Sequence, residues 1–192
     1  MRRHDAMTAA PVMMDESESL LASIRAARSG DSRAFETIML ATERRIASLA
    51  WNILGDAEEV KEALQETFVR VFRHLDRYDE QRDFFGWLYR IAVNVCRDLD
   101  SRRRRWRLFL PIEHAAEARA REVDFVMKDD VARLMRAIDQ LPRKERFAII
   151  LRDIEELPTD EVASILGSSP ATVRVQISNA RAKIRKLMES GR

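Results

Sequence analysis

The sequence predicts an all-α protein of two small helical domains joined by a flexible linker. Of its 192 residues, 46% are hydrophobic and 34% are charged, which is ordinary for a folded, soluble, helical chain. Only five glycines and five prolines occur, and no alternation of apolar and polar residues is sustained, which argues against sheets and tight hairpins. Apolar residues instead recur every three or four positions in several segments, the spacing of amphipathic helices.

The first part of the chain is expected to begin with a disordered lead-in over residues 1–18, because this stretch has no hydrophobic periodicity. We assign it no function. A short helix is expected from Leu20, and Gly30 should end it. Asp31 or Ser32 can then cap a second helix, since both side chains accept hydrogen bonds from free backbone amides.

Gly55 is expected to close that second helix, and Asp56 to cap a third one that runs to about Arg77. A loop over 78–83 leads into a fourth helix. Residues 19–105 are therefore predicted to form a compact bundle of about four helices.

The fourth helix combines a core face with a polar face. An apolar stripe runs from Phe84 to Leu99, and Arg90, Asn94 and Arg97 fall on the opposite side. Such a polar stripe is often only a solvated face. Here it continues into an arginine run, with five arginines and no acidic residue in 101–107, a density that repels itself unless phosphate or another polyanion lies nearby.

Aromatic residues are concentrated around the same loop and helix. They comprise Tyr78, Phe84, Phe85, Trp87 and Tyr89, five within twelve positions. Unstacked bases can stack on exposed rings, so a single nucleic-acid strand is a candidate ligand. Most of these rings can equally be core, which leaves Tyr78 of the loop as the candidate for stacking.

The second half begins after a linker expected over 106–130, where the apolar stripe is lost and the composition becomes acidic. A second domain is predicted over 131–192. Its end shows a short helix over 159–166, a turn at Gly167, and a longer helix that starts at Pro170. This order is typical of a helix-turn-helix that binds duplex DNA, although helical hairpins can show a similar pattern.

The last helix carries an outward valine, Val175, which gains nothing in water but can meet a thymine methyl in a major groove. Arg174 and Asn179 lie beside it and can address base edges. Arg181 and the lysines and arginine that follow can neutralise phosphates.

Signals of an enzyme are absent from the sequence. The three histidines are scattered, no metal-ligand spacing occurs, and no glycine-rich phosphate loop is present, so we expect no metal, no cofactor and no small-molecule substrate. The one cysteine, Cys96, is read as a packing residue. No long apolar run or signal peptide is found, which predicts a cytoplasmic protein.

Three segments resemble the extracytoplasmic-function (ECF) sigma factors of bacteria. They are GDAEEVKEALQETFVRVFRHLDRYD (55–79), FFGWLYRIAVNVCRD (84–98) and the stretch from LPRKERF to RAKIRKLM (141–188). The resemblance implies that the first domain docks on the clamp of RNA polymerase and captures the minus-ten promoter strand. The second domain then reads the minus-thirty-five duplex.

The resemblance also implies roles for individual residues. Contacts with core polymerase fall on Asp56, Glu59, Glu62, Gln65 and Glu66. Contacts with the minus-ten strand fall on Tyr78, Asp79, Asp83, Arg90, Asn94, Arg97, Asp98, Arg102 and Arg103. Contacts with the minus-thirty-five element fall on Ser169, Thr172, Arg174, Val175, Ser178, Asn179 and Arg181. The side chains at 175–179 are less polar and basic than is usual in the family.

The partners implied by the family are core RNA polymerase, promoter DNA and an anti-sigma factor, with a monomer in the free state. Two other classes stay open. The chain could be a conventional regulator that binds an operator alone through 159–188, or a helical adaptor with no role on DNA.

Overall fold

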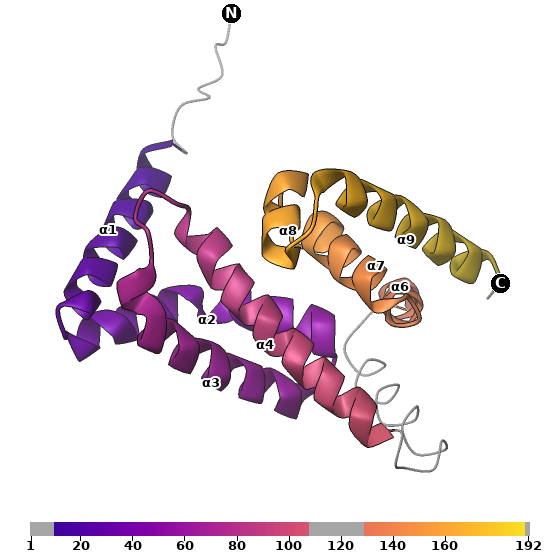
Figure 1. Cartoon of the computed structure of the whole chain (residues 1–192), viewed down its shortest axis with the longest axis horizontal. Coiled ribbons are helices and arrows are strands. Elements are labelled where there is room, and N and C mark those ends of the chain that lie inside the picture. Colours follow the sequence, from indigo (N-terminus) through magenta and orange to yellow (C-terminus); the bar gives the residue numbers. More distant parts are fainter. Residues whose placement is uncertain (1–9, 108–128, 191–192) are drawn as a thin grey trace, which may run out of the picture.

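The computed structural model describes residues 10–107 and 129–190. Throughout these ranges the regular structure is helical, and no strand occurs (Figure 1). The elements are α1 Ala10–Arg28, α2 Ser32–Leu54, α3 Ala57–His74, the 3-10 turn η1 Leu75–Arg77, α4 Phe84–Arg107, α6 Asp129–Asp139, α7 Arg143–Ile149, the π-helical turn η2 Ile150–Ile154, α8 Thr159–Leu166 and α9 Pro170–Ser190. The predicted all-α class is confirmed.

In the first helical unit, α1 to α4, helices begin and end at the predicted capping residues. Asp31 accepts hydrogen bonds from the backbone amides of Arg33 and Ala34 at the start of α2, and Asp56 accepts one from the Glu59 amide at the start of α3. Gly55 ends α2 with φ of 64°, a left-handed conformation that costs glycine little. Local chemistry therefore fixes these boundaries.

The first helix begins earlier than the sequence indicated. We expected a start near Leu20, whereas α1 begins at Ala10. Residues 10–19 have no apolar stripe, but Pro11 suits a first helical turn, and extending an existing helix adds one hydrogen bond for each residue ordered. The rest of the predicted lead-in, residues 1–9, lies outside the described residues.

The core of the first unit is built around α4, which contacts α2 and α3. Its predicted stripe is buried: Leu88 is 0% exposed, and Phe84, Val95 and Leu99 are nearly so. The same hydrophobic cluster continues into the second helical unit, α6 to α9. In Figure 1 the orange and yellow helices α6 to α9 lie on one side of α4, and α1 lies on the other.

The second unit ends in the predicted helix-turn-helix, with α8 and α9 packed together. Gly167 makes the turn with φ of 63°, and Ser169 caps α9 ahead of Pro170. Most of the predicted linker, residues 108–128, lies outside the described residues. Within the part of the chain that is described, no helix combines the length and the apolar character needed to cross a membrane.

Candidate nucleic-acid and polymerase interfaces

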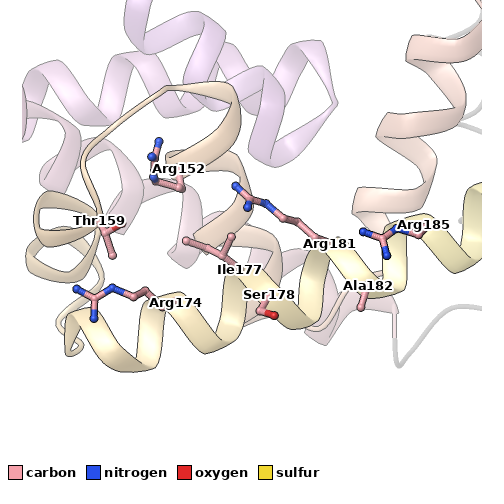
Figure 2. A pocket seen from close by; sticks show the side chains of 8 residues that line it. All are labelled: Arg152, Thr159, Arg174, Ile177, Ser178, Arg181, Ala182 and Arg185. Carbon is pink, nitrogen blue, oxygen red and sulfur yellow. The ribbon is translucent and has the colours of Figure 1, made fainter.

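A basic groove of about 510 Å³ runs along α9. Figure 2 shows side chains of α9 on one side of it, with Arg152 and Thr159 on the segments before α9. Its lining comprises Arg152, Thr159, Arg174, Ile177, Ser178, Arg181, Ala182 and Arg185. Four guanidinium groups around one concave surface favour a phosphate backbone as ligand.

The predicted base-reading residues of α9 face solvent. Arg174, Ser178 and Asn179 are exposed, and Val175 is 59% exposed although it is apolar. Among the described residues no carboxylate pairs with Arg174, so its guanidinium is free to contact a base or a phosphate. The opposite face of α9, with Val173 and Ile177, is buried against α7 and α8. The residues predicted to read bases thus lie on the exposed face of the helix.

Ser169 and Thr172 are both exposed at the start of α9, where they bond to each other. The Ser169 hydroxyl oxygen accepts a hydrogen bond from the Thr172 amide at 3.1 Å, and the two hydroxyls are 2.8 Å apart. This cap holds the first turn of α9.

Arg181 is less available than its place in the groove indicates. Its guanidinium makes two hydrogen bonds to the Asp153 carboxylate, at 2.8 and 2.7 Å. Because Asp153 belongs to η2, this fork ties α9 to the π-helical turn that follows α7. A phosphate that binds Arg181 must compete with this carboxylate.

The loop over 78–83 is ordered by its own side chains. Asp83 accepts a hydrogen bond from the Gly86 amide at 2.5 Å, which makes it the cap of α4. Asp79 accepts a bond from the Gln81 amide and lies 3.4 Å from Arg82. Both aspartates were predicted to touch the promoter strand, and both stay exposed while they hold the loop.

Tyr78 does not offer its ring for stacking, and the expectation that it does is wrong. The residue is only 3% exposed, its ring packs edge-on against Phe84 at 5.2 Å, and its hydroxyl donates to the Arg82 carbonyl at 2.7 Å. Burial of the Tyr78 ring removes a large apolar surface from water, so Tyr78 fixes the start of the loop to the core of the domain.

The polar face of α4 divides into two parts. Asn94 and Asp98 are exposed, and Asp98 lies 3.2 Å from Arg70 of α3. Arg90 instead bonds to the Ser164 hydroxyl of α8, and Arg97 is half-buried beside the second unit. Only the Asn94 side of the predicted strand-binding face is therefore open in this arrangement.

The predicted polymerase-docking residues on α3 also fall into two groups. Glu62 and Gln65 are exposed and Glu66 is half-exposed, and the three line one groove with Asp98 and residues of α4. Asp56 is occupied as the helix cap.

Glu59 was expected on the outer side of α3, but its side chain is only 22% exposed and lies 2.7 Å from Arg103. That interpretation of Glu59 is corrected, because a partner 44 residues away in sequence turns it inward.

The arginine run is largely neutralised within the chain. Arg102 pairs with Glu62 at 2.5 Å. Arg103 bonds to Glu59, to Asp100 and to the Leu54 carbonyl, and its side chain is 15% exposed. Arg103 is therefore a structural residue, and its predicted role on phosphate is corrected. Arg105 is exposed and stays available.

The two helical units meet at a polar seam between α4 and the second unit. Asp100 is 0% exposed and accepts a hydrogen bond from Arg146 of α7 at 2.8 Å. Arg143 bonds to the Arg97 carbonyl at 2.5 Å. Although burial raises the pKa of the Asp100 carboxyl, Arg146, Arg104 and Arg103 together hold that pKa below its usual range.

A second carboxylate, Glu155, completes this seam. It accepts hydrogen bonds from the Asn52 amide at 2.9 Å and from the Tyr89 hydroxyl at 3.2 Å. Burial and the nearby charge of Glu155 raise the pKa of Tyr89 to about 12. Asp100 and Glu155, the two carboxylates of the seam, are thus each held by a partner on the opposite unit.

Comparison with known families gives two matches that together follow the two units. Sigma-70 region 2 matches residues 38–108, and Sigma-70 region 4 matches residues 132–184. The RNA polymerase sigma-H factor of Pseudomonas aeruginosa is 30% identical over 171 residues, 83% of this chain and 89% of that protein. The ECF RNA polymerase sigma factor SigW of Bacillus subtilis is 30% identical over 175 residues, 85% of this chain and 93% of that protein. The chain belongs to the ECF sigma factors of RNA polymerase.

Solved structures agree with this family. The structure of CnrH in complex with the cytosolic domain of CnrY shares 27% identity at a TM-score of 0.67, covering 90% of this chain and 98% of that one. RpoE of Bartonella quintana, solved with the anti-sigma factor NepR, has a TM-score of 0.62 at 19% identity, covering 82% of this chain and 98% of that one, and shares the fold. The sigma factor is thus a transcription initiation factor that acts with core RNA polymerase on promoter DNA.

Two features of this sigma factor were missed from its sequence. Arg152 joins the basic groove, because η2 brings it beside α9, and no local spacing announces that position. The seam partners Asp100 and Arg146 are 46 residues apart and were read as ordinary helix positions. No cluster of three or more potential metal ligands occurs among the described residues.

Proposed function

We propose that this sigma factor divides promoter recognition between its two units, 19–105 and 131–192, joined by the segment 106–130. The exposed Asn94 face of α4 and the loop over 78–83 take the minus-ten strand. The basic groove of α9 takes the minus-thirty-five duplex. Each unit contributes binding, and the chain performs no chemistry of its own.

The observation that carries this proposal is the pair of distinct polar surfaces on the two units. On α9, an arginine without a carboxylate partner stands beside an exposed valine, which suits the major groove. On α4, the exposed Asn94 amide stands near a capped loop with exposed aspartates, and such hydrogen-bonding groups suit the edges of unpaired bases. One duplex-binding surface alone would leave the second surface without a role.

We propose that α3 docks on core polymerase through Glu62, Gln65 and Glu66. The three side chains share one groove, and the two carboxylates there are held by the exchangeable partners Arg102 and Arg70. Basic side chains of a partner could replace these arginines with little loss, because exposed ion pairs contribute little to stability.

We further propose that the free chain is a cytoplasmic monomer restrained by an anti-sigma factor. The family resemblance supports this regulation. CnrH, a similar protein solved in complex with the cytosolic domain of CnrY, supports a protein partner for this chain.

The deciding experiment is transcription in vitro with purified core polymerase and this chain, with the start sites sequenced. Promoter-dependent initiation is expected, and binding of duplex DNA by the free chain should be weak. Tight, sequence-specific binding of duplex by the chain alone would favour the operator-binding regulator instead. If the chain neither initiates transcription nor binds DNA, the helical adaptor becomes the favoured class.

A further inference from the structure

The last turn of α1 is ion-paired to the loop over 78–83. Arg25 lies 2.8 Å from one carboxylate oxygen of Glu80, and Arg28 donates to the other oxygen at 3.0 Å. Arg28 also donates to the Asp76 carbonyl at 3.1 Å, at the base of the same loop. Arg28 therefore bridges the start of the loop and its middle, and each oxygen of Glu80 has its own arginine.

The rest of the loop is held from its two ends. Tyr78 is buried at the first end and Asp83 caps α4 at the second. Glu80 lies between these anchors, and among the described residues its carboxylate pairs with two arginines of α1. Asp79 also holds this part of the loop from within, so the contact with α1 is the one that ties the middle of the loop to another helix.

A small cavity of about 120 Å³ lies at this junction. Leu20, Leu21 and Ile24 of α1 line one side, and loop residues that include Glu80 and Asp83 line the other. The apolar wall comes from α1 and the polar rim from the loop. A change in the position of α1 would therefore alter both the shape of this cavity and the position of its rim.

We propose that α1 belongs to the promoter-specificity machinery, with Arg25 and Arg28 as positioning residues that set the conformation of the loop through Glu80. This inference rests on the proposed role of the loop in binding the minus-ten strand. None of the three residues needs to touch DNA. They act by holding the loop in the shape that the strand requires.

The physical reason is preorganisation. A six-residue loop that is free in its middle must be ordered when the strand binds, which weakens binding. Such a loop can also rearrange to fit more than one base, which lowers discrimination among bases. The Arg25 hydrogen bond lowers the pKa of the Glu80 carboxyl, so the carboxylate is charged at neutral pH. Arg25 is 66% exposed, so salt should weaken its ion pair with Glu80.

The experiment selects promoters from a library randomised at the minus-ten element, using holoenzyme made from the full chain. Wild type is compared with Glu80→Gln, with Arg28→Ala and with the double variant. We expect the ratio of selection between the preferred base and the other bases at the minus-ten element to fall by about three- to tenfold in each variant. The effect of the double variant should be smaller than the sum of the two single effects, because both changes break the contact between Arg28 and Glu80 while each also breaks one other contact.

The controls separate positioning from charge and from folding. Arg33→Ala removes one arginine from the start of α2, where no carboxylate pairs with it among the described residues, and should leave discrimination unchanged. Arg28→Lys keeps the charge but cannot bridge both partners, so it should restore discrimination only in part. Thermal unfolding identifies any variant that has lost its fold, and affinity for core polymerase should stay at the wild-type value.

Two results would overturn the inference. One is that base discrimination stays unchanged in Glu80→Gln and Arg28→Ala but changes in Gln81→Ala, which alters the loop itself. The proposed function of the loop would then stand, and the positioning role of α1 would be rejected. The other is a uniform gain in DNA binding for Glu80→Gln at all sequences, which would make Glu80 a mere repulsive charge. If Gln81→Ala and Asp79→Ala both leave discrimination unchanged, the proposed role of the loop fails instead.

Discussion

Arg146 of α7 donates a hydrogen bond to Asp100 of α4 at 2.8 Å, and both side chains are almost completely buried. Arg103 and Arg104 approach the same carboxylate at 3.1 and 3.2 Å. Asp100 is thus in direct contact with four arginines, Arg103 and Arg104 of its own helix and Arg143 and Arg146 of α7. A buried carboxylate that offsets several cations cannot be removed without leaving those cations uncompensated.

Replacing Asp100 with asparagine should therefore lower the free energy of unfolding by about 3 kcal/mol. Urea unfolding at neutral pH measures this change. Asp98→Asn is the matched control, because its carboxylate is 67% exposed and its ion pair with Arg70 should contribute less than about 1 kcal/mol. Equal effects of the two substitutions would mean that the seam contributes no more than a surface pair.

Acid should remove the same contribution. The pKa of Asp100 in the folded chain lies below its ordinary value of 3.8, so its stabilising effect is fully present above that pH. It is lost as the pH falls through the lower, folded-state pKa. Wild type should therefore lose more stability than Asp100→Asn below pH 3.8, as measured by urea unfolding across that range. Parallel pH profiles for the two chains would contradict this.

Asp153→Asn should strengthen binding at the minus-thirty-five element. The change releases Arg181 from its two hydrogen bonds, which lets its guanidinium contact phosphate. Holoenzyme affinity should rise several-fold, and the slope of log affinity against log salt should steepen by roughly one phosphate contact. Asp160→Asn removes the same charge from α8, where no partner is recorded among the described residues, and should change affinity less. A similar gain in both would reflect net charge alone.

Arg174→Ala should weaken holoenzyme binding to the minus-thirty-five element by roughly tenfold, because an exposed arginine at a reading position gives about 1–3 kcal/mol of discrimination. Binding to templates with and without that element measures the loss. Lys144→Ala, on α7 outside the basic groove, serves as the control. An unchanged promoter preference in Arg174→Ala would remove Arg174 from the reading face.

Asn94→Ala should impair promoter opening while affinity for core polymerase is kept. The Asn94 amide is exposed on α4, and the docking residues lie on α3. Permanganate reactivity of unpaired thymines reports opening, and fluorescence anisotropy reports binding to the core. Gln140→Ala removes an exposed amide from the turn after α6 and should affect neither. Loss of both activities in Asn94→Ala would place this residue in the polymerase interface.

Cys96 should resist thiol reagents in the folded chain. Burial raises the pKa of its thiol to about 12, so very little thiolate exists at pH 8. Reaction with a disulfide reagent should be on the order of a hundredfold slower than in the urea-unfolded chain. Fast labelling under native conditions would show that α4 opens readily.

The features that could be predicted from sequence are those governed by near neighbours. Asp31, Gly55 and Asp56 mark helix ends through contacts within a few residues, and the helix-turn-helix follows from Gly167 and Pro170 in the same way. The buried stripe of α4 follows from helical periodicity. Each of these depends on chemistry visible in a short window of sequence.

What could not be predicted depends on partners far away along the chain. Glu59 looked exposed on a helical wheel, yet Arg103 draws it inward across 44 residues. Tyr78 looked like an exposed loop ring, yet the rings of Phe84 and Trp87 pack against it. The arginine run suggested a phosphate ligand because its acidic partners, on α3 and within α4, become neighbours only after folding.

The bond between Arg90 and Ser164 has a thermodynamic consequence for promoter capture. The Ser164 hydroxyl engages one guanidinium nitrogen of Arg90, so only the fraction of molecules in which this bond has opened can offer that nitrogen to a DNA strand. The observed dissociation constant for the strand equals the intrinsic one divided by that fraction. Every substitution that tightens the seam should therefore raise the concentration of sigma factor needed for initiation, and every one that loosens it should lower that concentration.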